Sequence, residues 1–260
     1  MSTNDDLGDR MKQYEQTYTN VKMLPRVPII IRLDGVSFSK WTKPYKKAQG
    51  KEDPFNNELR EAFVETCKIV GDKMHGAKLF YMQSDEITIL LTDESKNDHV
   101  LNAWFGWKLQ KIVSIAASMF TAHFNEILKP TKPAYFDARA FSLPNMDEVN
   151  NCFLWRERDC VKNSVSMLAH SMFSHKSLHG LKDGQMQEKL FTEGGINWNN
   201  ITSWKKRGTV IGRVASERSV VYKRDGVEHN TMALRSKWEE IEFNSFGKTS
   251  VSEIIQSNKG

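Results

Sequence analysis

The chain has 260 residues, 27% of them charged, and a formal net charge of only +5. This length fits one large domain, or a core domain with an appendage, and the charge alone does not indicate a nucleic-acid-binding protein. No apolar stretch approaches the roughly 18 residues of a membrane span, and residues 1–6 lack the features of a secretory signal. Cys67, Cys152 and Cys160 show no C-x-x-C spacing, which disfavours a zinc site or a disulfide framework. We therefore expect a cytoplasmic protein with reduced cysteines and no membrane partner.

Strand-like and helix-like segments alternate through the first half of the chain. Residues 27–34 form an apolar run that predicts a strand, and the polar, lysine-rich residues 39–53 predict a loop. Asp53 and Pro54 have the residue types of an N-cap and a first helical position, while Gly76 supplies a stop. The elements that follow are short strands at 78–82 and 86–92, a long helix at about 102–129 and a strand at 134–143.

The order of these elements, βαββαβ, is that of a ferredoxin-like sheet and places the chain in the α+β class. In such a sheet the first and third strands lie side by side and antiparallel at the centre. The C-terminal end of the first strand, with Asp34, therefore lies beside the N-terminal end of the third, with Asp85. We expect residues 1–144 to form this core and residues 145–260 to form a helical and β-hairpin extension packed on it.

The second half of the chain predicts helices to about residue 174 and over 183–192, followed by a hairpin. Its strands are expected at 209–214 and 219–224 with a turn at 215–218, and residues from Ser245 onward are expected to fray. Residues 201–224 carry seven Lys or Arg against one acid, which fits either an RNA-backbone surface or an ordinary charged hairpin face. The RNA-binding candidates are Lys205, Lys206, Arg207 and Arg213.

Two acidic positions, Asp34 and Asp85, adjoin buried strands and allow two interpretations. Asp34-Gly35 is a common hairpin dipeptide, and Ser84-Asp85 fits a solvated hairpin tip. A carboxylate beside a buried strand is costly unless it is paired, hydrogen-bonded or bound to a cation. Because the topology brings the two acids together, they favour a hard-cation site for phosphate chemistry, with the Gly35 carbonyl as a third oxygen.

Three cations are candidates for holding phosphates near these acids. Lys108 and Lys111 are three apart and share one face near the start of the long helix, although a solvated lysine face has the same spacing. Arg32 alternates with the apolar residues of the first strand, so it either points into the cleft or pairs with an exposed acid.

Several short motifs occur in a specific order between about residues 25 and 215. They are Ile31 to Phe38 (IRLDGVSF), Gln83 to Glu86 (QSDE), Phe136 to Arg139 (FDAR), Arg158 to Cys160 (RDC), Gly195 to Asn199 (GINWN) and Lys206 to Thr209 (KRGT). In this order they resemble the tRNA-histidine guanylyltransferase superfamily, and most of all its Thg1-like proteins. The resemblance implies a polymerase- and cyclase-like palm and 3′–5′ addition of nucleotides to RNA.

The resemblance also implies roles for individual residues. Two Mg²⁺ ions would be held by Asp34, the Gly35 carbonyl and Asp85, with Glu86 supporting this catalytic group. Triphosphate would be held by Arg32, Lys108 and Lys111. The other residues of the implied nucleotide site are Gly35, Val36, Ser37, Phe38, Ser39, Ser84 and Asn163. The implied assembly is a homotetramer whose partners are tRNA, bound at its 5′ end and acceptor stem, and ATP, GTP and other NTPs.

One departure limits this transfer of roles. Eukaryotic members carry a histidine directly after their Asp-Cys pair, where this chain has Val161, so the role of that histidine is not assigned. We expect a template-dependent nucleotidyltransferase that activates the RNA 5′-phosphate with ATP or GTP, for tRNA repair or for guanylate addition to tRNA-histidine. The alternatives are another palm chemistry, such as a nucleotide cyclase or a 5′–3′ polymerase, or a non-catalytic RNA-binding module.

Overall fold

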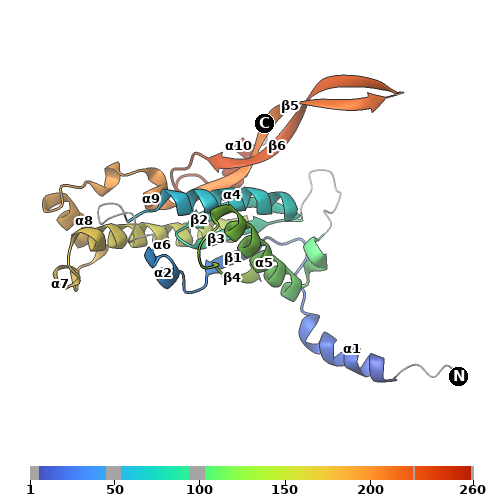
Figure 1. Cartoon of the computed structure of the whole chain (residues 1–260), viewed down its shortest axis with the longest axis horizontal. Coiled ribbons are helices and arrows are strands. Elements are labelled where there is room, and N and C mark those ends of the chain that lie inside the picture. The colour runs from blue at the N-terminus through green and yellow to red at the C-terminus, as the bar shows by residue number, and fades with distance from the viewer. Residues whose placement is uncertain (1–5, 45–53, 94–102, 225, 259–260) are drawn as a thin grey trace.

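The computed structural model describes residues 6–44, 54–93, 103–224 and 226–258, and one antiparallel sheet forms its centre (Figure 1). The sheet has the strand order β4-β1-β3-β2-β5-β6. Its strands are β1 (Ile29–Gly35), β2 (Ala77–Gln83), β3 (Glu86–Leu91), β4 (Phe136–Ser142), β5 (Thr209–Arg224) and β6 (Val227–Ile241). The strands β4, β1, β3 and β2 have the order and directions expected of a βαββαβ unit, which confirms the α+β prediction.

Helices cover both faces of this sheet. On one face, α4 (Asn57–Lys73) and α5 (Leu109–Leu128) pack against Ile29, Ile31 and Leu33. On the other face, α6 (Met146–Met172) and α10 (Val251–Ser257) pack against Ile30. Successive strand residues point to opposite faces, so a strand buried on both sides requires the continuous apolar run that β1 has.

The remaining helices are short or lie at the periphery. They are α1 (Asp6–Thr19), α2 (Phe38–Trp41), α7 (His175–Leu178), α8 (Asp183–Thr192) and α9 (Ser203–Arg207), with 3₁₀ turns at Trp104–Trp107 and Trp198–Asn200. Helix α1 projects away from the body of the molecule (Figure 1). No helix in the described ranges is long and apolar enough to cross a membrane.

The register of the central strands brings the predicted acids to one place. Asp34 of β1 lies opposite Glu86 of β3, and Asp85 immediately precedes Glu86 in the β2–β3 turn. On its other side Asp34 lies opposite Asp137 of β4. The meeting of the C-terminal end of β1 with the N-terminal end of β3, predicted from the element order, is therefore confirmed.

The start of α4 differs from its prediction. Its N-cap is Asn56, whose side-chain oxygen accepts a hydrogen bond from the Leu59 amide at 2.8 Å. Pro54 precedes the helix, and Asp53 lies outside the described residues, as does most of the loop predicted at 39–53. The part of that loop that is described begins with α2. Gly76 does follow the helix, with a φ of 82° that glycine adopts without strain.

The hairpin near the C-terminus is much longer than predicted. β5 continues through 215–218 without a turn, and β6, which the sequence analysis did not predict, pairs along its length. The base of the hairpin joins the core sheet, because Leu79–Met82 of β2 pair with β5, while its distal part projects from the body (Figure 1). Distal side chains such as Met232 and Leu234 are exposed, so the buried alternation that identifies a strand is missing there.

The last described residues are helical, and the prediction of fraying from Ser245 onward is wrong. Ser250 and Glu253 form a capping box that starts α10: Ser250 Oγ accepts from the Glu253 amide at 3.2 Å, and Glu253 Oε2 accepts from the Ser250 amide at 2.7 Å. Val251 and Ile254 are buried beneath α6. A reciprocal cap together with an apolar face stabilises even this short helix.

Candidate active site

Asp34 and Gly35 end β1, where the chain folds back into α2. Ser37, the N-cap of α2, has a left-handed backbone with φ of 54°. A Cβ atom at Gly35 would approach the Phe38 ring to 2.5 Å, closer than a real contact, so this fold-back requires glycine. Phe38 in turn packs on Phe63 at 5.7 Å between ring centroids. The loop beside Asp34 is therefore fixed to the aromatic core.

Asp85 lies in the tight turn between β2 and β3. Its neighbour Ser84 has φ of 50°, a left-handed conformation that is uncommon for a non-glycine residue. Ser84 Oγ donates a hydrogen bond to Asp85 Oδ1 at 3.0 Å. Left-handed residues occur both in tight hairpin turns and at functional sites; here Ser84 is exposed, whereas Asp85 is partly buried.

The carboxylates of Asp34, Asp85 and Glu86 repel one another. Burial is the main cause that raises the pKa of Asp85, and the charges of Asp34 and Glu86 raise it further, whereas hydrogen bonds such as that from Ser84 lower it. A cation bound between the carboxylates would favour their ionised forms.

Glu86 is held by an arginine that the sequence analysis did not identify. Arg156 of α6 donates two hydrogen bonds to Glu86, from Nε to Oε1 at 2.6 Å and from Nη2 to Oε2 at 2.7 Å, and a third from Nη1 to Asp159 Oδ2 at 2.6 Å. The guanidinium is nearly buried, and so is the Glu86 side chain. A paired geometry of this kind fixes orientation as well as charge. The Arg156–Asp159 spacing marks only the pair within α6, and no sequence signal points to Glu86.

A pocket of about 420 Å³ lies beside the acids, between α2, α4, α6 and α9. Phe55 and Trp204 meet edge to face at 5.9 Å in its lining, and Lys205 Nζ is 5.5 Å from each ring centroid. Aromatic rings beside a cation suit a nucleobase and its phosphates. The predicted site residues in the lining are Gly35, Ser37, Phe38, Ser39, Ser84, Asp85 and Asn163.

Helix α6 supplies one wall of the pocket. Cys160, Asn163, Ser164 and Met167 share one helical face and line it. Ser164 Oγ accepts a hydrogen bond from Trp198 Nε1 at 3.0 Å, so this hydroxyl is already engaged. Val161, at the position of the family's histidine, packs against the neighbouring apolar cluster instead.

Four predicted site residues lie beside the pocket rather than in its lining: Arg32, Asp34, Val36 and Glu86. Val36 is 47% exposed. Along their strands, Arg32, Asp34 and Glu86 alternate with residues that face α4 and α5. Their side chains therefore point to the α6 face of the sheet. Arg32 is an interior cation there: its Nε is 4.0 Å from Glu86 Oε2.

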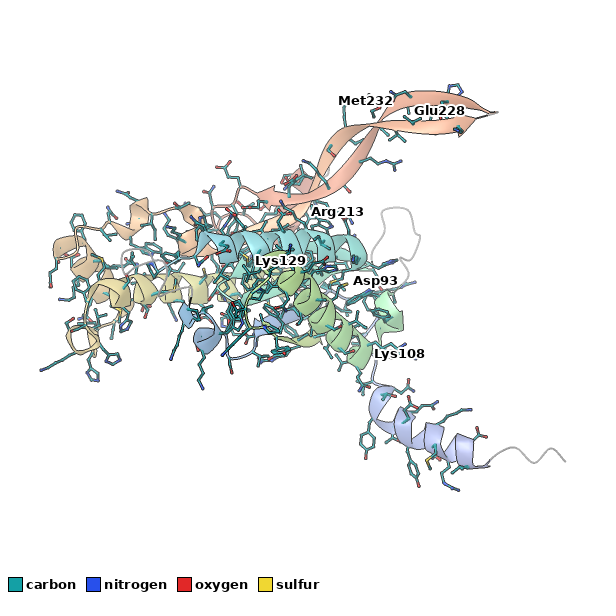
Figure 2. The ribbon with its side chains drawn as sticks, in the orientation of Figure 1. Asp93, Lys108, Lys129, Arg213, Glu228 and Met232 are labelled. Carbon is teal, nitrogen blue, oxygen red and sulfur yellow. The ribbon has the colours of Figure 1, made fainter. Side chains whose placement is uncertain are left out.

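Lys108 and Lys111 do not reach the pocket of their own chain. Lys108 is the N-cap of α5, and its backbone forms a bridge with Lys22, ahead of β1. The other end of α5 lies near the site, because Phe124 packs on Phe38 at 6.2 Å. Sixteen helical residues separate Lys108 from Phe124, a rise of about 24 Å, and Figure 2 places Lys108 at the end of α5 nearest α1.

The four RNA-binding candidates have different environments. Arg207 Nη1 is 2.6 Å from Oε1 of Glu157, a buried carboxylate. The charge of Arg207 is therefore paired with an interior acid. Lys205 lines the pocket, and Lys206 Nζ donates to the Asn199 carbonyl at 2.6 Å. Arg213, near the base of the hairpin (Figure 2), lies over the Trp238 ring at 5.0 Å and lines a separate cavity of about 810 Å³.

An antiparallel sheet covered by helices, with carboxylates where its central strands meet, is the arrangement of a palm domain of the polymerase and cyclase type. The family model for tRNAHis guanylyltransferase (Thg1) matches residues 8–144, just over half of the chain. The chain belongs to this tRNAHis guanylyltransferase family.

The chain is also similar to individual proteins. The chain is 30% identical over 233 residues to the uncharacterized protein R259 of Acanthamoeba polyphaga mimivirus, with 80% of this chain and 77% of that protein covered. It is 25% identical over 225 residues to the tRNA(His) guanylyltransferase of Saccharomyces cerevisiae, with 78% and 88% covered.

Solved structures show the same fold. A bacterial tRNA(His) guanylyltransferase (Thg1)-like protein in complex with GTP matches with a TM-score of 0.74 and 40% identity, covering 94% of this chain and 95% of that one. A bacterial Thg1-like protein in complex with ATP matches with a TM-score of 0.73 and 48% identity, covering 80% and 88%.

Proposed function

We propose that this chain is a template-dependent 3′–5′ nucleotidyltransferase that adds nucleotides to the 5′ end of tRNA. The observation that carries the proposal is the convergence of Gly35, Ser84 and Asp85 on a pocket with an aromatic and cationic wall. The ATP and GTP complexes of the bacterial relatives support a nucleotide in this pocket. The tRNA(His) guanylyltransferase relatives support tRNA as the acceptor.

Two transfers account for the reaction. The RNA 5′-phosphate attacks the α-phosphate of ATP or GTP, which gives a 5′-nucleotidylated RNA and releases pyrophosphate. The 3′-hydroxyl of the incoming NTP then attacks the activated 5′-phosphate: a new phosphodiester forms, a nucleoside monophosphate leaves and the hydroxyl proton passes to solvent. Such transfers depend mainly on positioning and charge stabilisation.

The acids fit a pair of Mg²⁺ ions. Mg²⁺ binds proteins through one or two carboxylates, with waters and substrate phosphates completing its shell. Asp34, Asp85 and the Gly35 carbonyl provide such a partial set. Within the described ranges no group of three or more His, Cys, Asp or Glu side chains is placed to hold a metal ion, so waters and substrate oxygens would complete the shell. When bound, the ions would neutralise phosphate charge and lower the pKa of the attacking hydroxyl.

The protein residues around the acids would position the reactants. Ser84 fixes the Asp85 carboxylate, and Arg156 fixes Glu86 beside Asp34. In the pocket, Phe55 and Trp204 would contact the base of the incoming nucleotide, while Lys205 and Asn163 would contact its polar groups. Arg32 would add positive charge on the α6 side of the acids.

We further propose a cytoplasmic homotetramer. Exposed apolar side chains on the projecting elements, Tyr18 of α1 and Leu234 of β6, support assembly through these segments. Lys108 and Lys111 would then be available to a neighbouring chain. Light scattering tests this directly: a tetramer of the 30.0 kDa chain has a mass of about 120 kDa, and a monomer in solution would contradict it.

Extension of tRNAs truncated at the 5′ end, with each NTP supplied separately, tests the proposed function. Addition that follows the opposite strand indicates repair, and addition of GTP alone to tRNA-histidine indicates maturation. A labelled product formed from NTP without RNA would instead indicate a cyclase and would overturn the proposal.

A further inference from the structure

Trp155 of α6 has an unusual environment for a half-exposed indole. It is 49% exposed, yet two guanidinium groups lie over its ring, Arg156 at 4.4 Å and Arg32 at 5.7 Å from the centroid. Both arginines also form ion pairs with Glu86 at the start of β3, so the indole is tied to the sheet through them. About half of its surface is nevertheless open to solvent.

Cations over the ring fix it in one orientation. The two arginine side chains are themselves only 10% and 18% exposed, which favours a strong cation–π contact. A half-exposed aromatic ring whose orientation is fixed by its neighbours can stack a planar ring without losing much side-chain entropy. Proteins use such rings to stack on exposed faces of nucleic-acid bases.

The position of Trp155 relative to the acids indicates which base it meets. Arg32, beneath the indole, precedes Asp34 by two residues on the same strand face, a distance of about 7 Å. The nucleotide pocket does not include Trp155 in its lining. Asp34 is also outside that lining, so the second of the two substrates can approach the acids from the Trp155 side.

The neighbouring edge strand adds exposed charge to the same face. Arg139 of β4 lies opposite Arg32 in the register, so the two side chains share the α6 face of the sheet. The Arg139 side chain is 56% exposed, and its ion pair with exposed Asp137 is 3.8 Å long, a contact that contributes little stability. Arg139 can therefore exchange this partner for a backbone phosphate.

We infer that Trp155, held by Arg32 and Arg156, is a stacking platform for the 5′-terminal base of the acceptor RNA, which it positions so that its 5′-phosphate lies beside Asp34 and Asp85. The inference rests on the proposed function and adds the site of the second substrate. The activating nucleotide also carries a base. The experiment therefore distinguishes stacking of the RNA base on Trp155 from stacking of the free nucleotide's base.

The direct probe is a truncated tRNA with a 5′-monophosphate and 2-aminopurine as its 5′-terminal base, titrated in EDTA without NTP. Stacking on Trp155 quenches this fluorophore in the wild-type protein. Trp155→Leu should abolish the quenching and weaken binding about 5- to 150-fold, the range for one stacked base, whereas Trp155→Phe should retain most of both. The matched control is Phe191→Leu on α8, an aromatic residue 59% exposed, which should change neither.

Three further measurements complete the experiment. If Trp155→Leu is unstable, the fluorophore is moved five nucleotides inward in the wild-type complex, and quenching confined to the terminal position supports the platform. Unchanged quenching and affinity in Trp155→Leu would overturn it. A raised KM for ATP in Trp155→Leu with normal quenching of the RNA fluorophore would also overturn the inference, because the indole would then bind the free nucleotide. Extension activity of the wild-type protein on unlabelled RNA separately tests the proposed function.

Discussion

Arg156 binds Glu86 through two parallel hydrogen bonds, at 2.6 and 2.7 Å, and so joins α6 to the strand end that carries the acidic site. Glu86 lies opposite Asp34 in the sheet and next to Asp85 in the chain. The orientation of the acids therefore depends on a helix from the second half of the chain as well as on the strands of the first.

Replacement of Arg156 by methionine should destabilise the fold and reduce activity. It leaves the nearly buried Glu86 carboxylate without its partner, and breaking a buried pair from one side costs about 3–5 kcal/mol. Urea denaturation measures the loss. The double variant Arg156→Met/Glu86→Met should recover part of the stability but not the activity. The exposed Arg158→Met serves as the control, and an equal loss in that variant would contradict a specific pairing.

The Asp85→Asn substitution should stabilise the metal-free protein near neutral pH while abolishing activity. The folded pKa of Asp85 is raised above its ordinary value, chiefly by burial, so its ionised form disfavours the folded state. Stability from this group is present below the unfolded pKa and is lost as pH rises through the raised folded pKa. Thermal melts in EDTA should show a higher Tm for the variant at pH 7 than for the wild type, and a smaller difference at pH 4.

Activity of Asp85→Asn should fall by at least about 100-fold, since losses of 10- to 100-fold already follow from removing residues that merely support a metal ligand. Retained activity of Asp85→Asn would contradict the catalytic role of Asp85. A lowered Tm would contradict the conclusion that the ionised Asp85 disfavours the folded state.

Replacement of Glu157 by glutamine should raise the KM for the nucleotide more than it lowers kcat. Glu157 accepts hydrogen bonds from Arg207 Nη1 at 2.6 Å and from the Phe246 amide at 2.8 Å. Arg207 immediately precedes Gly208, which lines the pocket. Loss of the Glu157 charge should therefore loosen this part of the pocket wall and weaken its link to the C-terminal segment through Phe246. Steady-state kinetics with varied NTP measures the effect. The exposed Glu148→Gln on the same helix should be neutral; a fall in kcat alone in Glu157→Gln would refute this positioning role.

The Gly35→Ala substitution should cost about 1–3 kcal/mol of stability, the usual range for overpacking. Its Cβ would meet the Phe38 ring at 2.5 Å, so the ring or the strand end must shift. Chemical denaturation and activity measure the two consequences together. Gly184→Ala is the matched control, because no atom lies within 4 Å of its added Cβ and alanine favours the helix. Equal stability of the two variants would show that the fold-back tolerates a side chain.

The core of the fold and the proximity of the acids can be predicted from the sequence, because both depend on local hydrophobic patterns and on the strand arrangement of one known topology. The apolar run of β1 and the order βαββαβ are enough to place Asp34 beside Asp85. Residues 35–39 and Asn163 were placed in the site by resemblance, and the pocket includes four of those five loop residues and Asn163.

The missed features depend on contacts between distant segments. Arg156 pairs with a residue 70 positions away and Arg207 with one 50 positions away, so no local pattern marks either partnership. Helix spacing could show that Lys108 and Lys111 share a face. It could not show that the N-terminal end of α5 lies far from the pocket. The distal hairpin escaped prediction because backbone pairing, rather than burial, defines its strands.

The most direct test of the central claim is the direction of chain growth. A truncated tRNA with a 5′-monophosphate and a periodate-oxidised 3′ end is incubated with protein, Mg²⁺, ATP and α-³²P-labelled GTP, so that only the 5′ end can grow. Growth at the 5′ end should give labelled RNA one or more nucleotides longer, with the label released by nuclease from the 5′ side, and no such product from Asp34→Ala. No extension of the 3′-blocked RNA, alongside extension of the unblocked RNA, would contradict it.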